Sequence, residues 1–231
     1  MIENSDFETF LYISKNKYQI FVYDKNNLKN LYHEEIENND EIELNILSKF
    51  IDDNIYKIEK MIKNFIGNII LIIEDDKVLD IGISLKKKNY EKNIDQKQLE
   101  NSLVEVKDIF KENYQDLIIM HMIIVEKENS FLLNNVNSND DYLFLEVNFI
   151  SISNNFTFNF NKLLENQQIK IKRYMSGGYI KSFFDKETRE SLELFVIANK
   201  LNDGLNKNEV QLVSKGIENK GFFEKFFQLF S

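Results

Sequence analysis

An amphipathic helix followed at once by an uninterrupted apolar strand constrains the fold of this chain more than any other feature. Residues 42–65 predict the helix, because apolar side chains recur there every three or four residues, at Ile51, Ile55, Ile58, Ile62 and Phe65. Gly67 stands where the C-cap of that helix is expected. Residues 69–73 are all apolar, a pattern typical of a strand covered on both faces. Together they predict a fold that combines an amphipathic helix with a buried strand.

The remaining elements predict a mixed α/β, or α+β, architecture. Aromatic and β-branched residues favour a strand hairpin over residues 7–13 and 18–23, with a weaker third strand over 28–36. Further strands are expected at residues 78–85, 117–125, 131–132, 142–152 and 169–174, and further helices at 95–111, 155–166 and 186–201. Gly177 and Gly178 mark a turn, and residues 202–215 are polar enough to form a linker.

The composition excludes several classes of function. The chain has 231 residues, of which 43% are hydrophobic, enough for a buried core. It has no cysteine and only two histidines, His33 and His121, which excludes thiol catalysis, thiolate metal sites and multi-histidine metal sites. A net charge of −9 argues against a nucleic-acid partner. The start is acidic and polar, and no apolar run reaches the roughly 18 residues of a spanning helix, so we expect a cytoplasmic protein.

The last residues form the sharpest sequence feature. On a helix, six large apolar side chains fill one arc of roughly 160°: Phe222, Phe223, Phe226, Phe227, Leu229 and Phe230. Lys220 and Lys225 border that arc. So short a segment cannot fold alone in water and needs a groove, a partner or a membrane interface. The lysines, the aromatic residues and the preceding polar linker favour the membrane surface, and a helix docked on its own protein is the alternative.

No motif predicts catalysis, a cofactor or a metal ion, so we expect a protein that is not an enzyme. Asp80-Ile-Gly-Ile-Ser84 resembles the phosphate-binding hairpin of actin-like ATPases, but it follows strands and a helix instead of opening the fold, and a plain strand is the better interpretation. Ser176-Gly-Gly178 lacks the lysine and spacing of a phosphate loop. His121 is expected to be a half-buried strand residue, because no acid stands at ligand spacing. The adjacent acids Glu34-Glu35 and Asp75-Asp76 are expected in solvated turns.

The order of elements and the terminal segment resemble FtsA, the family of actin-like division proteins that tether FtsZ filaments to the membrane. The similarity is carried by Ile119-Met-His-Met-Ile-Ile124, Leu145-Glu-Val-Asn-Phe-Ile150 and, most specifically, Lys220-Gly-Phe-Phe-Glu-Lys-Phe-Phe227. It implies a remnant of the first actin-like subdomain in residues 1–75 and 179–203, and an inserted SHS2-like β-α-β-β-β-α-β module in 76–178. A linker at 204–218 and an amphipathic membrane-targeting helix at 219–231 would follow.

Two departures from the family shape the expected function. The hairpin from Tyr12 to Tyr18 lacks the Asp-x-Gly that contacts nucleotide phosphate, and the second actin-like half, which carries the usual FtsZ docking surface, does not follow Arg173. The resemblance therefore implies an adaptor without ATP, peripheral on the inner membrane face, that recruits other division proteins. Self-association through sheet edges is expected, and FtsZ is a doubtful partner.

Two alternatives stay open from the sequence. One is a pilus-assembly adaptor of the PilM type, which is also actin-like with an SHS2-like insertion. The other is a small nucleotide-binding ATPase that uses residues 80–84.

Overall fold

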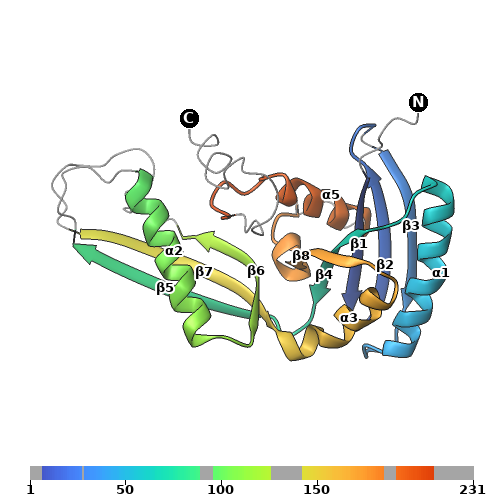
Figure 1. Cartoon of the computed structure of the whole chain (residues 1–231), viewed down its shortest axis with the longest axis horizontal. Helices are drawn as coiled ribbons and strands as arrows, with labels where there is room; N and C mark the ends of the chain where they lie inside the picture. The colour runs from blue at the N-terminus through green and yellow to red at the C-terminus, as the bar shows by residue number, and fades with distance from the viewer. Residues whose placement is uncertain (1–6, 28, 89–95, 126–141, 185–190, 211–231) are drawn as a thin grey trace. The chain divides into compact units, whose positions relative to one another are not determined.

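The computed structural model describes residues 7–27, 29–88, 96–125, 142–184 and 191–210 (Figure 1). They form a mixed α+β protein, as expected. The chain divides into two compact units. Unit 1 comprises Met1–Val78 and Ser153–Asn202, and unit 2 comprises Leu79–Ile152 and Asp203–Ser231. The first segment of unit 2 is therefore an insertion between the two segments of unit 1.

Unit 1 is built on a five-stranded sheet in the order β3-β2-β1-β4-β8. Its strands are β1 (Phe7–Ser14), β2 (Lys17–Asp24), β3 (Lys29–Glu37), β4 (Asn68–Glu74) and β8 (Lys170–Ser176). The first three form an antiparallel meander, whereas β4 lies parallel to β1 and β8 lies parallel to β4. All five apolar residues of β4, from Ile69 to Ile73, are buried, which confirms the predicted strand with two covered faces.

Helices cover both faces of this sheet. On one face lies α1 (Leu44–Ile62), which buries Leu47, Phe50, Ile51, Ile55 and Ile58. The amide of Gln167, just after α3 (Asn154–Asn166), donates to Asp52 of α1. On the other face lie α4 (Gly177–Lys181) and α5 (Ser191–Asn202), where the ring of Phe195 stacks on Phe21 of β2 with centroids 4.7 Å apart.

The end of α1 differs from the sequence expectation. Lys63 takes a left-handed conformation with φ 54° and ends the helix, so Gly67 is not its C-cap. Phe65, predicted on the buried face, consequently leaves the helical register and is 85% exposed. Ile66 is buried instead, and its backbone N–H donates to the side chain of Glu59 at 3.0 Å.

Unit 2 is a three-stranded sheet with one helix. The strand order is β5-β7-β6, from β5 (Leu79–Lys88), β6 (Leu117–Ile124) and β7 (Tyr142–Ser153). The helix α2 (Gln96–Asn113) packs its apolar side chains on the inward residues of β7, and Phe110 stacks on Phe149 at 4.4 Å between ring centroids. The strand expected at residues 131–132 lies outside the described residues.

The borders of the inserted module differ from those expected. The sequence assigned residues 76–178 to that module, but β8 pairs along its length with β4, and α3 leads into β8. Both elements therefore belong to unit 1. The pairing of β8 with β4, a strand far away in the sequence, assigns β8 to unit 1. The local sequence of β8 does not reveal that pairing.

Part of the predicted linker is also folded. The N–H of Ile124 donates to the carbonyl of Asn208 at 2.9 Å, and the N–H of Val210 donates to Met122 at 2.8 Å. Ile123 and Glu209 thereby form an antiparallel bridge. Residues 208–210 complete the edge of β6, where backbone groups would otherwise lack partners. The later part of the linker, residues 211–218, lies outside the described residues.

Candidate functional sites

The first candidate site is the edge of the unit 1 sheet where its parallel strands end. In open sheets of this kind, ligands bind at the carboxyl ends of the strands. Here β1, β4 and β8 end at Ser14, Glu74 and Ser176. The side chains at this edge therefore indicate what the sheet can bind.

Glu74 accepts two hydrogen bonds at this edge from its own unit. The hydroxyl of Tyr12 donates to Oε2 at 2.6 Å, and Nζ of Lys181 donates to Oε1 at 2.7 Å. Burial raises the pKa of the Tyr12 hydroxyl, and the hydrogen bond to Glu74 raises that pKa further. The hydroxyl thus stays protonated and remains a donor. Together these contacts leave Glu74 as a fixed, charge-paired group.

Gly177 lets the chain pass close to Glu74. A Cβ atom at position 177 would lie 2.8 Å from Cβ of Glu74 and 3.0 Å from its Oε2. The sequence predicted a plain turn at Gly177 and Gly178, but both residues begin α4. Ser176 caps that helix, because its Oγ accepts from the N–H of Tyr179 at 3.2 Å. A side chain at position 177 would displace the carboxylate.

Lys15 and Asp76 form the second pair at this edge. Nζ of Lys15 lies 3.0 Å from Oδ2 of Asp76, and both side chains are largely exposed. The hydrogen bond from Lys15 lowers the pKa of Asp76 and raises the pKa of Lys15. Asp75 and Asp76 lie in the turn after β4, as expected. Glu34 and Glu35 do not lie in a turn; they are strand residues of β3, and Glu35 accepts from the amide of Gln19 at 2.6 Å.

Beside this edge lies a cavity of about 510 Å³ in unit 1. Its apolar walls come from Ile42, Leu44, Phe156 and Phe160, and charged side chains of both signs, among them Lys77 and Asp75, stand around it. Nζ of Lys77 lies 4.4 Å from the centroid of the Phe156 ring. The mixed lining suits an amphipathic ligand. Among the described residues, no group of three or more His, Asp or Glu side chains could hold a metal ion.

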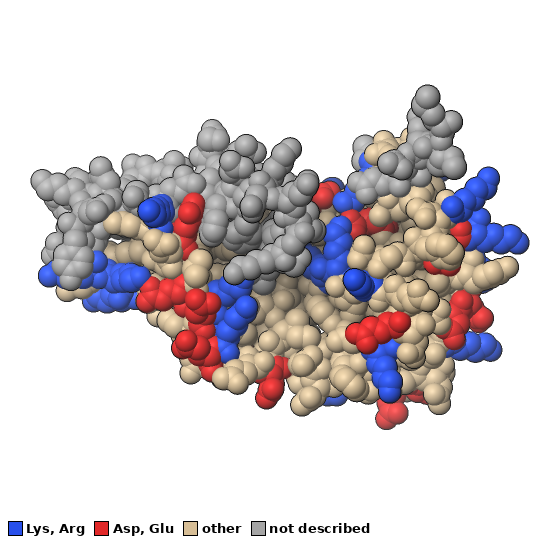
Figure 2. Space-filling view, viewed as in Figure 1, with Lys and Arg blue, Asp and Glu red and all other residues tan. Residues whose placement is uncertain are grey.

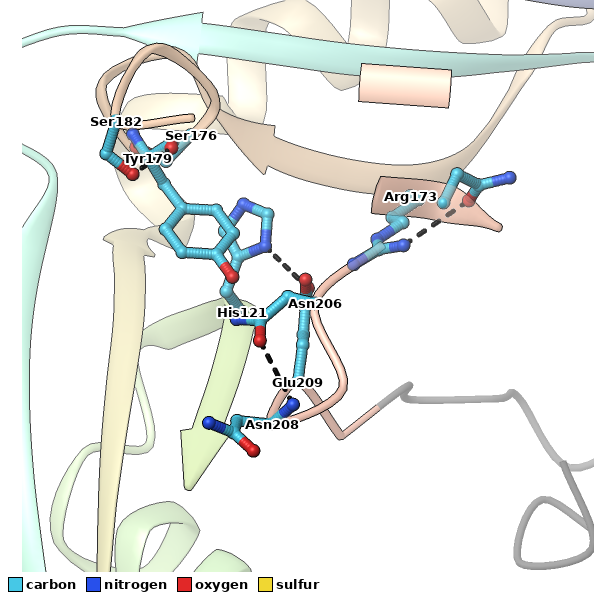
Figure 3. Close-up of polar contacts among 9 residues, drawn as sticks. His121, Arg173, Ser176, Tyr179, Ser182, Asn206, Asn208 and Glu209 are labelled. Carbon is cyan, nitrogen blue, oxygen red and sulfur yellow. Dashed lines mark hydrogen bonds and ion pairs between the residues drawn. The ribbon is translucent and has the colours of Figure 1, made fainter. Parts of the chain in front are cut away.

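The second candidate site is a buried polar pair in unit 2 (Figure 3). Nδ1 of His121 lies 2.7 Å from Oε1 of Glu209, and these residues are 1% and 5% exposed. The sequence predicted a half-buried histidine without an acidic partner. The structure corrects both points, because the acid comes from 88 residues further along the chain. No local spacing could have found this pair.

The remaining predicted residues fall in two groups. Asp80-Ile-Gly-Ile-Ser84 lies inside β5 and pairs residue by residue with β7, so it forms a strand and no hairpin turn. The predicted membrane-binding residues, Lys220, Phe222, Phe223, Lys225, Phe226, Phe227, Leu229 and Phe230, lie outside the described residues. Within the described part of the chain, no helix combines the length and hydropathy needed to cross a bilayer.

Comparison with known proteins finds likenesses among solved structures only. No protein-family model and no curated protein matches the sequence. The cytoplasmic domain of EpsL, an inner-membrane component of the type II secretion system of Vibrio cholerae, has a TM-score of 0.40 at 10% identity, over 79% of this chain and 61% of its own. A PilM–PilN type IV pilus biogenesis complex has a TM-score of 0.49 at 7% identity, over 75% of this chain and 48% of the matched chain.

A third solved structure is a Bacteroides thetaiotaomicron protein described as having an actin-like ATPase fold. Its TM-score is 0.35 at 14% identity, over 79% of this chain and 58% of its own. The chain thus spans about half to three-fifths of the length of these three solved chains.

Proposed function

We propose that this chain is a non-enzymatic adaptor that works at the cytoplasmic face of a membrane. The order of its elements supports an actin-like origin. Unit 1 has the strand hairpin, helix and buried strand on which the resemblance to FtsA depends, and unit 2 follows that strand as an insertion. The membrane role is supported by the amphipathic pattern of residues 219–231.

The observation that carries the non-enzymatic part is the internal pairing at the strand ends of unit 1. An actin-like nucleotide site needs backbone N–H groups and an acid free to face phosphate and metal. Here Glu74 is held by Tyr12 and Lys181, and Lys15 is held by Asp76. The hairpin itself is a tight polar turn in which the N–H of Lys17 donates to Oγ of Ser14 at 3.1 Å. These pairs favour a structural edge over a nucleotide site.

The finer proposal is a role in cell division, as an FtsA-type adaptor that recruits other division proteins. It depends on the resemblance of Lys220-Gly-Phe-Phe-Glu-Lys-Phe-Phe227 to the membrane-targeting helix of that family. A fluorescent fusion in dividing cells tests it. A band at the division site would support the role. Foci at pilus or secretion assemblies would contradict the division role and leave the membrane adaptor intact.

Sedimentation with liposomes of anionic lipid tests the membrane role directly. The full chain should pellet with the vesicles, and a chain that ends at Asn219 should stay in the supernatant. The truncation removes residues 220–231 and leaves every described residue in place. Equal sedimentation of both chains, or of neither, would contradict the proposed anchor.

A further inference from the structure

One face of the unit 2 sheet is open along β5. The side chains of Ile81, Ile83 and Leu85 pack toward α2. The residues between them point to the opposite face, and Gly82, Ser84 and Lys86 are exposed there. A Cβ atom at Gly82 would meet no other atom within 4 Å. The described residues thus cover this sheet with a helix on one side only.

A lysine–aromatic cluster lies at the end of this open face, where β5 ends and β7 begins. The register pairs Lys86 with Phe144 and Lys88 with Tyr142. Nζ of Lys86 lies 4.4 Å from the ring centroid of Tyr142 and 5.0 Å from that of Phe144. Phe144 is 59% exposed, and Tyr142 is 43% exposed. Figure 2 shows lysine atoms gathered at this end of unit 2.

Protection of an edge strand does not account for this cluster. Lysines on an edge strand can prevent unwanted strand pairing, and β5 is the edge of its sheet. Prevention of strand pairing requires only the positive charge of the lysines. Lys87, on the α2 side, forms an ion pair with Glu105 of α2. On the open face, in contrast, two large aromatic rings lie exposed under the cation, and clustered exposed apolar surface marks a contact site.

The chemistry of the cluster matches the surface of an anionic bilayer. Tyrosine and phenylalanine rings enter the headgroup region, and lysine side chains reach past them to the lipid phosphates. The four cross-strand residues include two cations and no acid. The nearest acid on this face of β7, Glu146, stands opposite Ser84, one pair further from the end. The cation of Lys86 and the exposed rings of Tyr142 and Phe144 suit a negatively charged partner surface with apolar depth.

We infer that the lysine–aromatic cluster of Lys86, Lys88, Tyr142 and Phe144 is a second membrane-contact site that binds anionic lipid headgroups. The inference builds on the proposed membrane role but uses residues separate from the C-terminal segment. Weak contacts at two sites would give the stable attachment that one short anchor cannot provide alone.

Binding of the full chain to phosphatidylcholine vesicles with and without phosphatidylserine tests the site. Each lysine near an anionic surface contributes roughly five-fold in affinity, so Lys86→Gln with Lys88→Gln should weaken binding roughly 25-fold. Phe144→Ser should weaken binding at least roughly ten-fold. The matched controls are Lys57→Gln with Lys60→Gln and Phe158→Ser, exposed residues of unit 1 that should leave affinity unchanged. Melting curves of all variants should coincide, because the side chains are exposed.

A parallel variant, Phe226→Glu, separates this inference from the proposed function. If Phe226→Glu abolishes binding and the unit 2 variants bind like the wild type, the second site is wrong and the C-terminal anchor stands. If the unit 2 variants lose affinity and Phe226→Glu does not, the second site stands and the anchor is wrong. Unchanged vesicle binding by the unit 2 variants would also be the result if the cluster serves an acidic protein partner, and it would overturn the inference.

Discussion

Nδ1 of His121 lies 2.7 Å from Oε1 of Glu209, and both residues belong to unit 2 and are buried. The bridge between Ile123 and Glu209 places the two side chains beside each other, since it fixes the backbone of residues 208–210 on β6. The pair and the bridge thus attach the segment after α5 to the sheet of unit 2.

Removal of one partner of this pair should destabilise unit 2. We expect His121→Leu to lower the free energy of unfolding by about 3 kcal/mol, because a buried carboxylate would lose a principal partner. Hydrogen exchange at the amides of Ile124 and Val210 should become faster, since both bond to the paired backbone. Urea unfolding and exchange measured by NMR check the two effects. Asp116→Asn, at an exposed position, is the control and should change neither.

Gly177→Ala should destabilise unit 1, whereas Gly178→Ala should not. The new Cβ atom at position 177 would stand 2.8 Å from Cβ of Glu74, and overpacking of this kind costs about 1–3 kcal/mol. At position 178 the nearest atom, Oγ of Ser176, would be 3.8 Å away, an ordinary contact. Thermal unfolding of both variants measures the difference. Equal melting temperatures of the two variants would contradict the prediction, because they would show that the backbone near Glu74 can shift without loss of stability.

The hydroxyl of Tyr12 should make unit 1 sensitive to alkali. Its pKa is raised in the folded protein, chiefly by burial and then by Glu74. The protonated form therefore stabilises the fold fully below the unfolded-state pKa of about 10, and this stability is lost as the pH rises through the higher folded-state pKa. Tyr12→Phe should remove part of the loss of stability above about pH 10. Unfolding curves at rising pH test this, with the exposed Tyr56→Phe as control.

We expect no measurable binding of ATP with magnesium. Residues 80–84 lie in the first half of the paired strand β5. At the unit 1 edge, Glu74 is engaged with Tyr12 and Lys181, and Asp76 is engaged with Lys15. Isothermal titration calorimetry checks the expectation. Measurable affinity that disappears in Asp80→Ala would restore the nucleotide-binding alternative.

Phe226→Glu should release the full chain from anionic vesicles without changing its melting temperature. Residue 226 lies in the centre of the predicted apolar arc, where a carboxylate would face the hydrocarbon side of the interface. Flotation of vesicles in a density gradient measures the loss. The control is Lys225→Gln, which keeps the apolar arc and should retain most binding.

Elements with strong local periodicity could be predicted from the sequence. The run from Ile69 to Ile73 and the spacing of Ile51, Ile55 and Ile58 fix β4 and α1, because burial of those side chains is the main source of their stability. The end of α1 could not be predicted. Lys63 adopts a left-handed conformation there, although the sequence offers Gly67 as the natural stop.

The candidate sites depend on contacts between distant residues, which no local pattern records. Tyr12 and Glu74 come together because β1 and β4 are neighbours in the sheet, and Gly177 approaches Glu74 because β8 is the next strand. The lysine–aromatic cluster likewise requires the register that pairs Lys86 with Phe144. The amphipathic pattern of residues 219–231 can be recognised from the sequence alone, because it is defined by local spacing, and the membrane role inferred from it stays a prediction.

The bridge from residues 208–210 to β6 also bears on how the chain is made. Glu209 leaves the ribosome 88 residues after His121, a delay of roughly 4–18 s at ordinary rates of synthesis. During that interval the edge of β6 lacks its contact with residues 208–210, and the imidazole of His121 lacks its contact with Glu209. A chaperone that binds open strand edges would therefore meet nascent unit 2 before residue 208 emerges, and would lose its binding site once the bridge closes.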